Sequence, residues 1–140
     1  MWADTWDPLE VGGVLAGYVN EAEIVITHLV GPGMEATHTP ISFLPDHAFH
    51  VAEIARIYRE SGGTCTYLGD WHTHPGGLPR LSPTDRSTLR QIAQDPEARC
   101  PKPMMMVLAG RQAQWEVAAF VQMPKQRRWS REMPVTLCVW

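Results

Sequence analysis

Two histidines separated by one residue, His72 and His74, follow residues 64–71, which predict a strand because β-branched and aromatic side chains come after a Gly-Gly break. Side chains two apart on a strand point to the same face, so the two imidazoles should lie side by side. The segment Ser82-Pro83-Thr84-Asp85 is typical of a helix start. The intervening loop can therefore return a carboxylate to two imidazoles, which makes three ligands. A catalytic zinc site uses that number and leaves one position for water.

Each half of this pattern has an ordinary explanation on its own. Histidine pairs such as His72 and His74 are common on protein surfaces. The Ser82 to Asp85 segment alone is a capping box, in which Asp85 caps backbone donors and binds no metal. Both halves at this spacing are a much more specific signal than either alone.

The sequence contains the pattern His72-x-His74, then a gap of seven residues, then Ser82-x-x-Asp85. This combined pattern resembles the signature of the JAB/MPN metallopeptidases, also called the JAMM family. The family pattern also requires a glutamate before a glycine-rich strand, and Glu10 before residues 12–17 fits. The resemblance implies that His72, His74 and Asp85 bind Zn²⁺. The resemblance also implies that Glu10 is the general base, which moves a proton from the water to the leaving amine. It implies that Ser82 donates a hydrogen bond to the oxyanion. Ser82 would also cap its helix, and the sequence does not separate the two duties.

The segments 67–75 and 10–17 resemble small bacterial JAB proteins first described with integrative and conjugative elements. Some of those are encoded beside ubiquitin-activating-like and conjugating-like enzymes in the antiphage systems called CBASS. The resemblance implies a zinc-dependent isopeptidase or peptidase that cuts after the C-terminus of a conjugated, ubiquitin-like protein, with those enzymes as operon partners. Two alternatives stay open: the same chemistry on a small substrate or sulfur-carrier precursor, and a non-catalytic binding module with the MPN fold. Family members usually carry a strand and a helix before the glutamate, whereas nine residues precede Glu10.

Composition excludes several other classes of protein. The chain has 140 residues, 44% hydrophobic and 19% charged, which predicts one globular domain over residues 1–140. A formal charge of -3 gives no reason to expect nucleic acid as a partner. No apolar run reaches the length of a membrane span, and the acidic N-terminus does not resemble a signal peptide. Three cysteines without CxxC spacing favour a reducing compartment, so we expect a cytoplasmic protein.

The pattern of apolar residues predicts a mixed sheet flanked by helices, an α/β or α+β domain with an MPN/JAB-like fold. Strands are expected at 12–19, 21–30, 64–71, 104–109 and 114–121, with a further edge strand at 135–140, and helices at 46–59 and 82–94. Residues 1–9 and 123–134 are expected to be irregular. The stretch from Gly31 to Pro45 is either a substrate-facing flap or an unstructured connector. Asp70 shares the strand face of the two histidines, but we leave it out of the predicted site.

Overall fold

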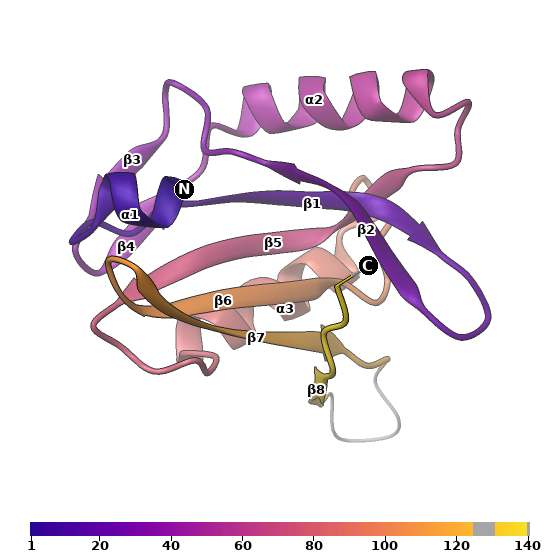
Figure 1. The fold of residues 1–140 in the computed structure, drawn as a ribbon. Coiled ribbons are helices and arrows are strands. Elements are labelled where there is room, and N and C mark those ends of the chain that lie inside the picture. The colour runs from indigo at the N-terminus through magenta and orange to yellow at the C-terminus, as the bar shows by residue number, and fades with distance from the viewer. Residues whose placement is uncertain (125–130, 140) are drawn as a thin grey trace.

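The computed structural model describes residues 1–124 and 131–139 and contains a six-stranded mixed sheet with the order β2-β1-β5-β6-β7-β8 (Figure 1). Neighbouring strands are antiparallel except β5 and β6, which run parallel. The chain crosses between these two through a helix, as parallel neighbours require. The strands are β1 (Gly12–Val19), β2 (Ile24–Val30), β5 (Thr66–Pro75), β6 (Met104–Arg111), β7 (Gln114–Gln122) and β8 (Glu132–Val135). The helices are α1 (Trp2–Trp6), α2 (His47–Glu60) and α3 (Pro83–Gln94), and a separate hairpin comprises β3 (Thr37–Thr39) and β4 (Ser42–Leu44).

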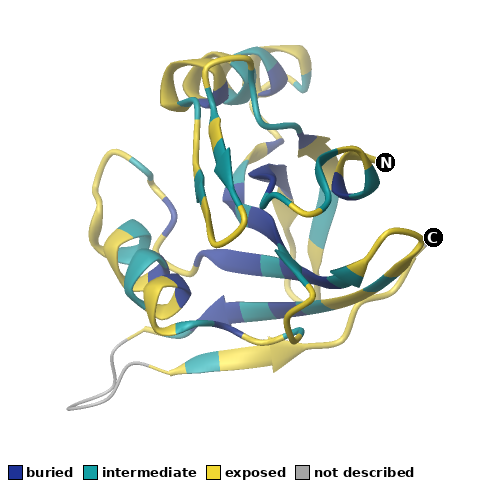
Figure 2. Ribbon diagram, turned by 90° about the vertical axis from the view of Figure 1, so that its left-hand side faces the viewer, coloured by how far each residue is buried: buried dark blue, intermediate teal, exposed yellow. Residues whose placement is uncertain are grey.

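The two long helices, α2 and α3, pack on the same face of the sheet. Ile57 of α2 packs against β1 residues such as Val14, and Leu89 of α3 packs against Val107 of β6. Val14 pairs with Asp70 and Val107 pairs with His72, so those two polar side chains emerge on this same face. The predicted ligand strand therefore presents Asp70 and His72 on the face that carries both helices. Figure 2 shows that the buried residues, in dark blue, concentrate in the central strands of the sheet.

The opposite face is covered by the N-terminal helix. Ala3 is buried in a cluster with Val11, Leu15 and Trp71, and Trp6 packs against that cluster. Asp4 accepts hydrogen bonds from the amide of Ala113 and the indole of Trp115, which join α1 to the β6–β7 turn. Residues 1–9 were expected to be irregular, and this was wrong for Trp2–Trp6. The short helix is held by contacts distant in sequence, which local patterns do not reveal.

A glycine bulge in β5 sets which residues face the helices. Gly69 has φ +147°, and a Cβ at this position would lie 1.9 Å from the carbonyl oxygen of Met104, so only glycine fits. The pairing of β1 with β5 shifts register between Leu15 and Ala16, next to Gly69. Because of the bulge, Tyr67 lies on the α2 side with Asp70, although three residues separate them.

The other differences from the expected elements lie at loops and edges. The Gly31 to Pro45 stretch contains the β3–β4 hairpin, so it is not an unstructured connector. The last strand is Glu132–Val135, whereas 135–140 was expected, so 132–134 are not irregular. Residues 125–130 of the expected irregular stretch lie outside the described part of the chain. Within the described residues, no helix combines the length and the apolar character that crossing a bilayer requires.

Candidate metal and catalytic site

The structure brings together the side chains of His72, His74 and Asp85. One nitrogen or oxygen atom from each lies within 4.8 Å of the other two. The Nε2 atoms of His72 and His74 are 2.9 Å apart, and the Asp85 carboxylate oxygens lie 3.1 Å and 3.3 Å from them. His72 and Asp85 are only 9% and 8% exposed. In the described part of the chain, no other group of three or more His, Cys, Asp or Glu residues converges in this way.

This set of donors fits a metal ion by its chemistry. Two imidazole nitrogens aimed at one point with a carboxylate beside them are the hard and borderline ligands that zinc and similar divalent ions take. Burial opposes ionisation of Asp85, but hydrogen bonds with His72 and His74 outweigh it and hold the pKa of Asp85 well below its ordinary value. The hydrogen bond with Asp85 raises the pKa of His74. The carboxylate therefore stays charged, as a metal ligand must be.

Asp85 occupies its place because it belongs to the first turn of α3. The Ser82 hydroxyl oxygen accepts a hydrogen bond from the Asp85 amide at 3.1 Å, and the Asp85 carboxylate accepts one from the Ser82 amide at 2.7 Å. The capping box expected from sequence is thus present, and the same carboxylate faces the two imidazoles. The geometry of this segment is compatible with both of these explanations. Since Ser82 uses only its oxygen in the cap, its O–H remains able to donate.

Glu10 lies just before β1, and its side chain is half-buried. Burial raises the pKa of Glu10, and the nearby Asp85 charge acts in the same direction, while His72 and His74 oppose them. The carboxyl is thus within electrostatic reach of all three clustered side chains. A carboxyl with a raised pKa beside such a cluster has the properties of a general base.

The hydroxyl of Thr73 fixes the Glu10 segment to the ligand strand. Thr73 is fully buried between the two histidines in sequence; its Oγ1 accepts from the Val11 amide at 3.0 Å, and its own amide donates to the Val11 carbonyl at 2.8 Å. The role of Thr73 was not predicted, because the expected strand ended at residue 71, whereas β5 extends to Pro75. A buried polar side chain needs a partner, but the sequence does not identify that partner.

Three other polar residues, Asp70, His28 and His50, lie outside the cluster. Asp70 lies on the same face of β5 as His72, as expected, but its carboxylate accepts a hydrogen bond from the Tyr67 hydroxyl at 2.7 Å, and burial raises the pKa of both groups. His28 is exposed, and the Nε2 of buried His50 lies 2.8 Å from the Gly31 carbonyl oxygen. Two hollows of about 210 Å³ and 540 Å³ lie near the β1–β2 turn and are lined by other residues. Neither hollow contains a comparable set of donor side chains.

Comparison with known proteins agrees with this geometry. The chain is 46% identical over 123 residues to the probable metalloprotease y4qB of Sinorhizobium fredii, a match that covers 85% of this chain and 74% of that protein. It is 31% identical over 107 residues to the CD-NTase/cGAS isopeptidase of Escherichia coli, covering 76% of this chain and 65% of that protein. A similar protein of Vibrio cholerae with the same name is 29% identical over 106 residues, with 76% and 65% covered.

The solution structure of protein DSY2949 from Desulfitobacterium hafniense shares the fold, with a TM-score of 0.62 and 19% identity over 93% of this chain and 79% of that one. Residues 2–131 match the family described as prokaryotic homologs of the JAB domain. That match spans nearly the whole sequence and includes Glu10, Ser82 and the His72, His74 and Asp85 cluster. The chain therefore belongs to the prokaryotic JAB-domain family.

Proposed function

We propose that this protein is a zinc-dependent isopeptidase that hydrolyses the bond after the C-terminus of a conjugated protein, with His72, His74 and Asp85 as metal ligands. The observation that carries the proposal is the convergence of these three side chains beside the half-buried Glu10. Relatives named metalloprotease and isopeptidase support hydrolysis of a peptide or isopeptide bond. The CD-NTase/cGAS isopeptidases also support a substrate that is a conjugated protein, which a defence operon with its own conjugating enzymes would supply.

The residues of the chain divide the reaction between them. A Zn²⁺ ion held by the cluster would lower the pKa of a water ligand to about 7 and polarise the scissile carbonyl. Glu10 takes the proton from the attacking water and returns it to the leaving amine, since its raised pKa suits both transfers. The Ser82 hydroxyl donates to the oxygen that becomes negative as the carbonyl is attacked. Thr73 holds the Glu10 segment against the ligand strand while this occurs.

The β3–β4 hairpin is the proposed substrate flap. Gly12 pairs with His72, and a Cβ on Gly12 would lie within 3 Å of the Phe43 ring, so the hairpin packs directly beside the site. At the hairpin, Ile41 is 87% exposed and Leu44 is 62% exposed, an apolar edge that an extended peptide can cover. Since the backbone of the substrate must pass close to the metal, small residues such as glycine should be preferred before the cut.

The test uses fusions of a ubiquitin-like protein to a reporter through its C-terminal residue, joined either by a peptide bond or to a lysine side chain. The zinc-loaded protein should cut directly after that residue, faster with Gly than with a bulky residue, and should act poorly on unrelated ubiquitin chains. A chelator should abolish cleavage, and Glu10→Gln should lower kcat by about 10²- to 10⁴-fold. Cutting that neither change slows would overturn the proposal, and tight binding of the fusion without cleavage would favour a non-catalytic module.

A further inference from the structure

The backbone of Glu10 is held by the hairpin on both sides of its own residue. Its amide donates to the Thr39 carbonyl at 2.8 Å, and the Nδ1 of His38 lies 2.8 Å from the Glu10 carbonyl oxygen. Because a carbonyl only accepts, the His38 nitrogen carries the proton and donates. Glu10 itself precedes β1, so the ladders of the main sheet do not fix it.

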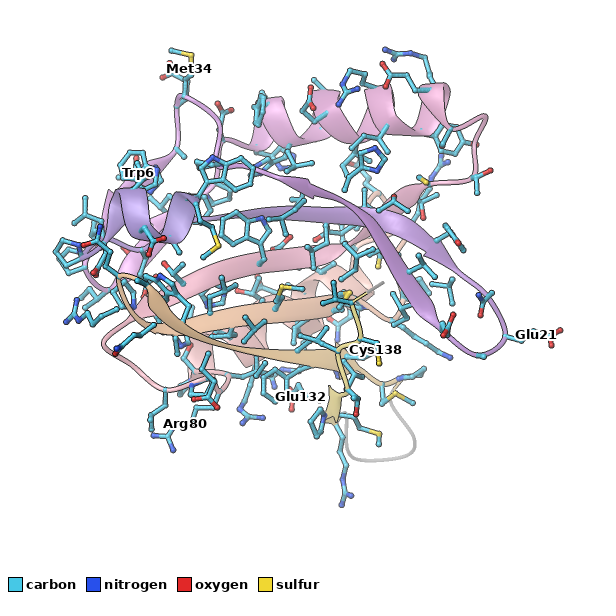
Figure 3. All side chains as sticks on the ribbon, in the orientation of Figure 1. Trp6, Glu21, Met34, Arg80, Glu132 and Cys138 are labelled. Carbon is cyan, nitrogen blue, oxygen red and sulfur yellow. The ribbon has the colours of Figure 1, made fainter. Side chains whose placement is uncertain are left out.

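The ring that makes this hydrogen bond is itself in contact with two aromatic side chains. The Trp6 indole stacks on the His38 imidazole with centroids 3.5 Å apart and planes at 13°, and Phe43 lies against the ring at 5.3 Å. Trp6 comes from α1, and Phe43 from β4. Figure 3 shows Trp6 at the end of the molecule where α1 meets the hairpin, opposite the β1–β2 turn that carries Glu21. Two aromatic contacts leave the imidazole little freedom to rotate away from Glu10.

We propose that His38, clamped by Trp6, is a positioning residue that fixes the backbone of Glu10 and thereby aims its carboxylate at the reacting water. This inference rests on the proposed function, because it assumes that Glu10 is the base. Such positioning matters because a general base acts only within hydrogen-bond reach of the proton that it takes. A displacement of about 1 Å can lower the rate about a hundredfold. A backbone that is free at Glu10 would spread the carboxylate over several positions.

The direct test is the amide exchange rate of Glu10, which requires no activity. In His38→Ala, loss of the donor should free this segment, so the Glu10 amide should exchange at least about tenfold faster, while amides in the β5–β6 ladder keep their rates. His38→Asn places an amide N–H where Nδ1–H was and should restore most of the protection. His28→Ala, which removes an exposed histidine of β2, is the matched control and should change nothing. Unchanged Glu10 exchange in His38→Ala would overturn the inference.

The activity test is a double-mutant cycle with Glu10→Gln. His38→Ala should lower kcat at least about tenfold with KM and bound metal nearly unchanged, and His38→Asn should recover most of kcat. In the Glu10→Gln background, His38→Ala should cost nothing further, because it acts through the missing carboxylate. An equal loss in both backgrounds would refute the positioning role. If Glu10→Gln alone keeps full turnover, the proposed function of Glu10 fails instead, and the exchange test still decides whether His38 holds the segment.

Discussion

The two halves of the site are built in different ways. His72 and His74 lie in β5, a central strand paired on both sides, and Asp85 lies in a capped first turn of α3. Glu10 lies outside the sheet ladders and is held by a hairpin, a buried threonine and a stacked histidine. The proposed metal-binding half is thus held in place by regular structure, and the proposed base is held only by tertiary contacts.

This difference suggests how the site can be altered. Regular elements tolerate change at a distance, whereas an irregular segment depends on each of its few partners. We therefore expect the metal-binding half to fail only when a ligand is removed. The base should fail when a residue of the hairpin or of α1 is removed, even though that residue does not touch the substrate.

The largest effect is expected from Asp85→Ala, which should abolish both metal binding and turnover and also destabilise α3. Asp85→Asn separates the two roles, because its amide oxygen can still accept from the Ser82 amide but carries no charge. It should unfold close to the wild-type temperature yet hold little zinc, measured by metal analysis after gel filtration. Stoichiometric zinc in Asp85→Asn would place the ion elsewhere.

Glu10→Gln should leave zinc and fold intact and lower kcat by about 10²- to 10⁴-fold, because it removes only the proton transfer. Metal content, thermal unfolding and single-turnover cleavage of a fusion substrate measure the three quantities. His74→Ala is the comparison, since it should lose the metal together with the activity. Equal metal loss in both variants would remove the distinction between the two halves.

The convergence of His72, His74 and Asp85 could be predicted from the sequence because its signals are local. A two-residue strand period and a capping box are short-range patterns, and they place His72, His74, Ser82 and Asp85 without knowledge of the fold. The roles of His38, Thr73 and Trp6 were not predictable, because their partners lie far away in the chain. The hairpin was missed for a similar reason: strands of three residues give too short a pattern to recognise, and α1 is fixed by contacts with the β6–β7 turn.

Ser82→Ala should cost about 3 kcal/mol in the activation barrier, for one lost oxyanion donor, and about 1 kcal/mol of stability, for the lost cap. Ser82→Gly is the matched variant, because glycine caps a helix at a cost of only a few tenths of a kcal/mol but has no hydroxyl. Both variants should therefore lose activity equally, while the alanine variant loses clearly more stability than the glycine variant in urea unfolding. Full activity in Ser82→Gly would limit Ser82 to capping.

The metal-free protein should lose stability as pH rises. In the folded protein Asp85 raises the pKa of His74 above its ordinary 6.5. The contribution of this pair to the free energy of unfolding is therefore fully present below pH 6.5 and is lost as pH rises through the pKa of folded His74. The pKa of Asp85 is lowered in the folded protein, so the carboxylate stabilises the fold above pH 3.8, the ordinary pKa of the group, and this stabilisation is lost as pH falls. Thermal unfolding from pH 4 to 9 should therefore peak in mildly acidic buffer. With zinc the trend should reverse above neutrality, since protons then no longer compete for the ligands.

The smallest effect is expected at the exposed tip of the hairpin, and it tests whether the flap touches the substrate. Ile41 is 87% exposed, so removing its apolar surface should leave stability, metal content and kcat unchanged. If an extended peptide covers Ile41, Ile41→Thr should raise KM about three- to fivefold, because each buried methylene contributes about 0.8 kcal/mol to binding. Val19→Thr, at the 64%-exposed end of β1 beside the opposite turn, is the matched control and should leave KM unchanged. A fall in kcat at constant KM for Ile41→Thr would instead indicate that the tip acts through His38 on Glu10. Equal KM values for Ile41→Thr and Val19→Thr would show that the tip of the hairpin does not contribute to substrate binding.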